Sequence, residues 1–221
     1  MGRRVTPVML AVWLLFEVAA AAQTGEGRVE VGGGVRWLGG TSYPRVSATE
    51  TSLANGRFTL FDSDTRLEPA TRVEARVGAR LTSVLQMEGA FSYSRPELQT
   101  RITSDVEGIS DVTLTDRITE YTFEGGITAQ LARWSFGRLA PFAAGGLGYL
   151  RQLHDGHGLV ETGQTYYVGG GFRVPFSLRR GLVKASGIRA DARAQFSRNG
   201  VALDEDTRIV PSLSASFFVR F

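Results

Sequence analysis

The stretch PSLSASFFVRF (211–221), at the end of the chain, shows which secondary structure builds this protein. Every second residue in it is apolar, counting back from the end: Phe221, Val219, Phe217, Ala215 and Leu213. The residues between them are serine or arginine, except for the out-of-pattern Phe218. A period of two predicts a β-strand, because successive side chains of a strand point to opposite faces. The chain therefore ends in a strand with one apolar and one polar face.

The same alternation recurs along most of the chain. RVEARVGARL (72–81), for example, places valine, alanine and leucine on one face and charged residues on the other. The pattern predicts eight strands, at residues 28–38, 70–82, 84–95, 118–131, 140–151, 165–177, 187–197 and 208–221. Short connections (83, 132–139, 178–186) alternate with long polar ones (39–69, 96–117, 152–164, 198–207), which predicts an up-and-down antiparallel meander. A ten-stranded version follows if GRFTLF (56–61) also pairs.

The positions of the aromatic residues separate a soluble barrel from one that crosses a membrane. With both termini on one side, one group of aromatics falls at the far ends of the strands: Trp37, Tyr93, Tyr121, Phe123, Tyr149, Tyr166 and Phe196. A second group falls at the near ends: Trp134, Phe172, Phe176, Phe217 and Phe221. Two aromatic belts around a band of small apolar residues are typical of a bilayer-spanning barrel. The fold class that we expect is an all-β, membrane-spanning, up-and-down antiparallel β-barrel, with eight strands favoured.

The N-terminal stretch MGRRVTPVMLAVWLLFEVAAAAQT (1–24) has a basic start, an apolar middle and small residues at its end. This layout predicts a secretory signal peptide over residues 1–22, cleaved after Ala22 or one residue earlier, and leaves 23–221 as the barrel domain. The apolar run is shorter than the roughly 20 residues of a spanning helix. The chain has no cysteine, which excludes disulfides, thiolate metal sites and cysteine nucleophiles. A net charge of +3 gives no argument for nucleic-acid binding.

Two further stretches, GRLAPFAAGGLGYL (137–150) and FFVRF (217–221), resemble the eight-stranded outer-membrane barrels of the OmpA/OmpX type. The resemblance implies a monomer in a Gram-negative outer membrane, with both termini in the periplasm and without the peptidoglycan-binding domain of OmpA. It also implies that Phe217, Val219 and Phe221 form the signature that the barrel-assembly machinery reads. Outer-membrane lipid and lipopolysaccharide would be its surroundings, and no extracellular partner can be named.

Charged residues occupy the polar face of nearly every predicted strand. The inward-facing set is Glu30, Arg36, Arg72, Glu74, Arg76, Arg80, Glu88, Glu124, Arg173, Arg189, Asp191 and Arg193. An eight-stranded barrel has an interior only wide enough for side chains, and charges buried there must pair. We therefore expect an arginine–carboxylate network that plugs the lumen. The alternative is a gated pore or a proton-relay path, and the alternative function is a narrow channel for small solutes.

No stretch of the sequence predicts a catalytic, cofactor-binding or metal site. His154 and His157 flank Asp155 in HDGHG, but a closed metal site needs about four ligands, so we expect exposed loop residues. The glycine clusters at 32–34, 145–148 and 169–171 lie inside strands with no helix following, which excludes phosphate loops and favours close backbone packing. DED (204–206) is expected to be a solvated loop, with cation bridging to lipopolysaccharide as its alternative.

The class of function that we expect is structural or surface-interaction work, with the long extracellular loops as contact surface. A lipid-modifying enzyme of the lipid A deacylase type would need a histidine–serine pair near the last strand, and none is apparent. We therefore expect no enzymatic activity and no cofactor.

Overall fold

The computed structural model describes residues 28–52, 56–104, 110–154, 160–176, 182–200 and 207–221. The predicted signal peptide and the segments that hold His157 and DED (204–206) lie outside these ranges. The described residues form twelve strands and one short 3-10 helix, η1 (Ala132–Trp134). No helix in this part of the chain has the length and apolar character needed to cross a membrane.

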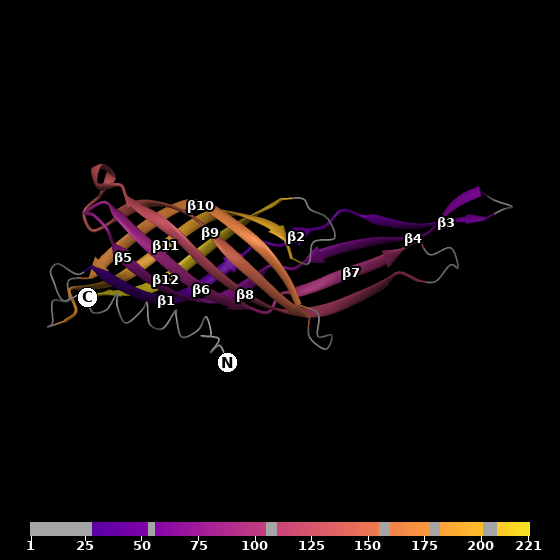
Figure 1. The fold of residues 1–221 in the computed structure, drawn as a ribbon, viewed down its shortest axis with the longest axis horizontal. Helices are drawn as coiled ribbons and strands as arrows, with labels where there is room; N and C mark the ends of the chain where they lie inside the picture. The colour runs from indigo at the N-terminus through magenta and orange to yellow at the C-terminus, as the bar shows by residue number, and fades with distance from the viewer. Residues whose placement is uncertain (1–27, 53–55, 105–109, 155–159, 177–181, 201–206) are drawn as a thin grey trace, which may run out of the picture.

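Eight of the strands close into an antiparallel barrel (Figure 1). In order around the ring they are β1 (Val29–Leu38), β5 (Ala70–Arg80), β6 (Leu85–Ser94), β8 (Val112–Gln130), β9 (Ala140–His154), β10 (Val160–Phe176), β11 (Ala185–Asn199) and β12 (Arg208–Arg220). The final strand closes the ring against β1, where Val31 pairs with Val219 and Val35 with Ala215. Closure leaves no unpaired sheet edge facing lipid. The predicted eight-stranded barrel is confirmed.

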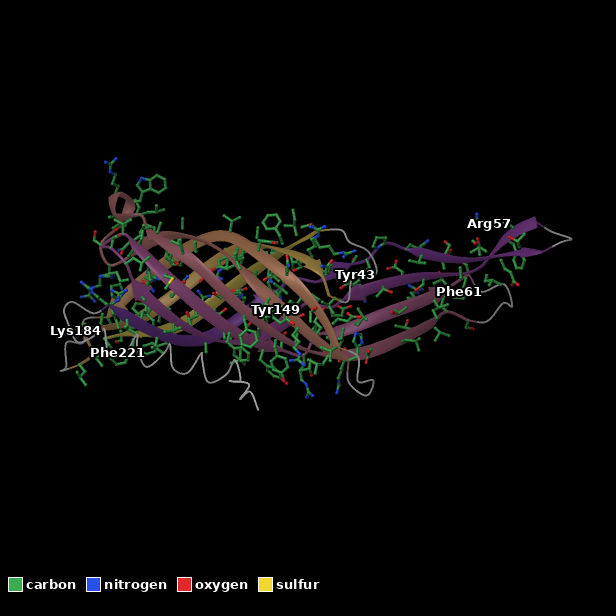
Figure 2. The ribbon with its side chains drawn as sticks, viewed as in Figure 1. Tyr43, Arg57, Phe61, Tyr149, Lys184 and Phe221 are labelled. Atoms are coloured by element: carbon green, nitrogen blue, oxygen red, sulfur yellow. The ribbon has the colours of Figure 1, made fainter. Side chains whose placement is uncertain are left out.

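The alternation of the sequence becomes a difference between the two surfaces of the barrel. On β5, Glu74 and Arg76 point into the lumen and are buried. Val73, the residue before Glu74, is 65% exposed on the outside. Aromatic residues of both predicted belts lie exposed on the outer surface, including Tyr149 near one end and Phe221 at the other (Figure 2). A polar interior with an apolar exterior is the arrangement of a barrel whose outside is lipid.

The out-of-pattern Phe218 does point inward, as its place in the alternation requires. It is 3% exposed, and the guanidinium carbon of Arg220 lies 5.6 Å from its ring centroid. Gly187 on β11 makes room for it, since a Cβ there would lie 2.7 Å from the Phe218 ring. The ring therefore fills the turn end of the lumen.

The prediction of long polar loops at 39–69 and 96–117 is wrong. These segments hold four more strands: β2 (Thr41–Ser42), β3 (Val46–Ser52), β4 (Gly56–Leu67) and β7 (Glu97–Thr103). Together with residues 112–117 of β8 they form a small sheet that projects beyond the barrel mouth (Figure 1), here called the extension. Threonine and valine favour strands even where both faces are wet, which is why polar segments could form one.

The ten-stranded alternative is also excluded by this arrangement. Residues 56–61 do pair, but with β3 in the extension and not with a strand of the ring. Tyr43 lies at the junction between the two parts, whereas Arg57 and Phe61 lie far out on the extension (Figure 2). The barrel and the extension thus share β8 as their common strand.

Candidate functional site

The centre of the lumen is organised around Glu124 of β8. Its carboxylate accepts two hydrogen bonds from Arg36 of β1, at 2.8 and 3.1 Å, and a third from Arg193 of β11 at 3.3 Å. Arg36 also forms an ion pair with Glu74 of β5. None of these side chains is more than 3% exposed. The planar guanidinium of Arg36 suits this bidentate contact, and four strands are joined across the lumen.

Nearer the turn end of the barrel, Asp191 and Glu88 share one arginine. Arg189 donates to Asp191 at 3.1 Å and to Glu88 at 2.7 Å. Arg193 completes the contacts of Asp191 at 2.7 Å, and Arg173 of β10 those of Glu88 at 2.6 Å. Because each carboxylate accepts from two guanidinium groups, its charge is compensated by charge-assisted hydrogen bonds within the lumen.

Nearer the extension, a separate pair joins Arg72 of β5 and Glu120 of β8. Arg72 also donates to the Thr122 hydroxyl at 3.1 Å, and Gln152 of β9 donates to Glu120 at 2.7 Å. Sequence reasoning missed Glu120, although its place two residues before Thr122 puts it on the same polar face. It lies within the predicted strand 118–131, so the alternation of that strand could have identified it.

The ion pairs join six deeply buried arginines to six carboxylates: Arg36, Arg72, Arg76, Arg173, Arg189 and Arg193 with Glu30, Glu74, Glu88, Glu120, Glu124 and Asp191. Arg220, also missed, pairs with Glu30 at 2.7 Å near the end of the lumen. Of the predicted set, Arg80 lies outside this deeply buried group, because it is half-buried at the end of β5. The buried charges therefore balance.

Strand β9 lines the lumen with apolar residues rather than charges. Phe142 lies under two arginines, with the guanidinium carbon of Arg189 at 4.3 Å and that of Arg173 at 5.0 Å from its ring centroid. Tyr167 of β10 lies in the same way 4.5 Å from Arg193. Aromatic faces attract desolvated cations, so these rings support the arginines that lie against them. Gly146 makes room for Tyr167, because a Cβ there would lie 2.8 Å from its ring.

Two small cavities lie in the lumen on either side of the central ion pairs. The one toward the extension has a volume of about 40 Å³ and is lined by Tyr43, Arg72, Glu120 and Arg208, among others. The one toward the turns has about 10 Å³ and is lined by Glu30, Glu88 and Phe218, among others. Since a cavity of about 10–15 Å³ is needed to hold one water molecule, these cavities hold a few waters at most.

The expectation that His154 is an exposed loop residue is wrong. It ends β9, its side chain is 11% exposed, and its Nδ1 lies 2.7 Å from Asp116 of β8. Its Nε2 lies 3.8 Å from Glu161 of β10. Within the part of the chain that the structure describes, no group of three or more His, Cys, Asp or Glu residues is arranged to hold a metal ion. The histidine thus ties three strands together where the extension begins.

The polar lumen, the apolar exterior and the closed ring of eight strands define this molecule as a membrane-spanning β-barrel. The model of the outer membrane protein beta-barrel domain family matches residues 8–199, and the chain belongs to that family. Family membership carries with it an outer-membrane location. A comparison with curated protein sequences gives no match.

Two solved structures show the same fold. The outer membrane protein OprG from Pseudomonas aeruginosa has 10% sequence identity and a TM-score of 0.51, over 88% of this chain and 96% of its own. Neisserial surface protein A has 12% identity and a TM-score of 0.52, over 87% of this chain and 97% of its own. At such identities the likeness extends to the fold alone.

Proposed function

We propose that this protein is a non-conducting surface protein of the outer membrane, closed by its lumenal ion pairs and presenting the extension as its contact surface. The observation that carries the proposal is the charge-balanced network that runs from β1 to β11 through Glu124. Ions would have to displace paired charges to pass, and separating a buried pair costs several kcal/mol, on the order of 3–5. This favours the plugged barrel over the narrow channel.

The extension is suited to contact because it is polar on its outer face and open at its edge. Arg101 pairs with Asp111 at 2.7 Å and Arg66 donates to Gln99 at 2.9 Å, so that this face carries exposed charge of both signs. Among the described strands β3 pairs with β4 only, which leaves its other edge unpaired. An unpaired strand edge offers backbone donors and acceptors to a partner.

Planar-bilayer recording tests the closed lumen. We expect no single-channel steps from the wild-type protein, and steps from the double variant Arg36→Ala/Glu124→Ala, in which the central pair is absent. The double variant also shows that the protein inserts and can be recorded. Reproducible single-channel steps from the wild-type protein would support the channel instead. A detergent gel of boiled and unboiled samples, in which a folded barrel migrates differently, confirms that both proteins are folded.

We propose no enzymatic role, because among the residues that the structure describes no buried polar group outside the ion-pair network is arranged as a nucleophile with a base. Mass spectrometry of lipid A from cells with and without the protein tests this point. Identical lipid A masses are expected, and loss or gain of an acyl chain would contradict the proposal.

We further propose that the chain is exported by cleavage of residues 1–22, remains a monomer, and is assembled through Phe217, Val219 and Phe221. Support comes from the outward position of Phe217 and Phe221 at the closing seam of the barrel. N-terminal sequencing of the protein from outer membranes should start at residue 22 or 23. A start at residue 1 would contradict cleavage.

A further inference from the structure

An open groove crosses the lipid-facing surface of β8, β9 and β10. It has a volume of about 520 Å³, and its lining includes Phe123, Gly125, Leu147, Tyr149 and Tyr166. Gly125 forms an open part of its floor, because a Cβ built there would meet no atom within 4 Å. The volume falls within the roughly 300–1,000 Å³ of small-molecule sites. The groove is thus large enough for part of a lipid molecule.

Aromatic rings form one wall of the groove and continue from it onto β6. The ring centroids of Phe91 and Phe123 are 5.1 Å apart, and Phe91 lies 6.2 Å from Tyr121. Tyr93 and Tyr121 are 5.4 Å apart. Such rings are enriched at the level where acyl chains meet headgroups. The groove therefore begins among the acyl chains and ends near the headgroups on the side of the extension.

Two arginines lie just beyond the aromatic rings. Arg151 of β9 lies opposite Tyr121 of β8 in the sheet, and Arg198 of β11 lies opposite Gln164 of β10. Both are exposed, and neither has an acidic partner in the portion of the chain that is described. The two arginines lie on either side of β10, so they are separated by two strand spacings, about 10 Å or more of sheet. This spacing suits a headgroup with two anionic groups.

The opposite side of the barrel differs. The structure describes every residue of β1, β5 and β12, and the outward faces of these strands carry no arginine. Near the extension these faces end with Trp37, Thr71 and Ile209. The groove and these two arginines therefore lie on the same side of the barrel, opposite the strands whose outward faces carry no arginine. A general attraction to the membrane surface would not require this asymmetry.

We propose that the face formed by β8–β11 binds lipid A. An acyl chain of the lipid lies in the groove, and the two lipid A phosphates bind Arg151 and Arg198. Guanidinium groups bind phosphate through paired, charge-assisted hydrogen bonds. Lipid A is chosen over a phospholipid because it carries two phosphates and occupies the outer leaflet, on the side of the extension. The proposal does not depend on whether the lumen conducts.

Native mass spectrometry of the full chain in detergent, titrated with bisphosphorylated lipid A, tests the proposal. Arg151→Gln and Arg198→Gln should each weaken binding about tenfold, the loss of one hydrogen bond to a charged group. Gly125→Leu fills the groove floor and should weaken binding to a similar extent.

Gly33→Leu is the matched control, because Gly33 is exposed on β1 of the opposite side and a Cβ there would lie 3.5 Å from the nearest atom, Glu74 O. Arg57→Gln, on the extension, is the control for lost charge.

Unchanged binding by both arginine variants, or equal losses with Gly33→Leu and Gly125→Leu, would overturn the proposal. Equal binding of phosphatidylglycerol and lipid A would overturn it too, since any anionic phospholipid would then suffice. Each variant is first compared boiled and unboiled on a detergent gel, so that weaker binding is counted only for a folded barrel.

Discussion

The two halves of β8 have opposite polarity although they belong to one continuous strand. In the barrel, Phe123 and Ile127 are each 53% exposed on the outer face, while Glu124 points into the lumen. In the extension the apolar residues change faces: Val112 and Leu114 share the inward face of Glu124, and Arg117 is on the outer one. The reversal falls between Arg117 and Tyr121. The polarity of this one strand thus matches two different surroundings, lipid around the barrel and water around the extension.

The same reversal explains how each part is stabilised. In the extension Val112 pairs with Ile102, so two apolar side chains meet across neighbouring strands, and Leu114 pairs with Thr100. Cross-strand pairs of this kind contribute roughly 0.2–1 kcal/mol each. In the barrel the side chains that meet inside are charged, and the stabilising contacts are ion pairs. A substitution should therefore have different effects in the two parts, even at residues of equal exposure.

The largest effect is expected at the centre of the lumen. Glu124→Gln removes the charge that compensates Arg36 and Arg193, and should lower the free energy of unfolding by about 3–5 kcal/mol. Denaturant unfolding in detergent micelles measures this. Glu50→Gln on the extension, where Glu50 is exposed, should change it by less than about 0.5 kcal/mol. Equal effects of the two variants would show that the lumenal pairs contribute no more than a surface charge.

The next largest effect tests the outer surfaces directly. Leu213 of β12 and Leu114 of the extension are both 56% exposed. Leu213→Arg should destabilise the protein by about 2–4 kcal/mol, because it places a charge in lipid. Leu114→Arg should change the stability by only about 0.5 kcal/mol, because its surroundings are aqueous. Refolding into lipid vesicles over a denaturant series gives both values, and similar losses would contradict the assignment of solvents.

A smaller effect is expected from neighbouring glycines on the two faces of β8. Gly126→Ala brings a Cβ to 2.5 Å from the Gly145 carbonyl oxygen, beside the Tyr167 hydroxyl, and overpacking of this kind costs about 1–3 kcal/mol. Gly125→Ala meets open space and should cost nothing measurable. Thermal unfolding of both variants in the same detergent compares their losses of stability. A larger loss at Gly125 would mean that the two faces have been exchanged.

The barrel could be predicted from the sequence because its two faces have different solvents. Lipid and a packed polar lumen impose strict alternation, as in 72–81, and that alternation gives both the strands and the direction of each side chain. The partners of each charge could not be predicted in the same way. Arg36 meets Glu124 from 88 residues away, and such a contact depends on strand register and tilt rather than on local pattern.

The extension could not be predicted because water lies on both of its faces. β3, with the sequence VSATETS, has no alternation that distinguishes it from a polar loop, and its pairing depends on β4. His154 was misassigned for a related reason. It lies three residues beyond the predicted end of its strand, where the strand continues as the polarity pattern weakens. Strand ends and water-exposed sheets are therefore where sequence patterns are least informative.

The reversal along β8 can be measured by site-directed spin labelling. The chain has no native cysteine, so a cysteine at each position from 112 to 130 can be labelled without background. In lipid vesicles, labels at Phe123 and Ile127 should collide with oxygen, which is enriched in the bilayer. Labels at Thr113, Thr115 and Arg117 should collide instead with a water-soluble nickel complex. Oxygen-dominated collisions at 113 and 115 would contradict the account, because the membrane would then cover the extension.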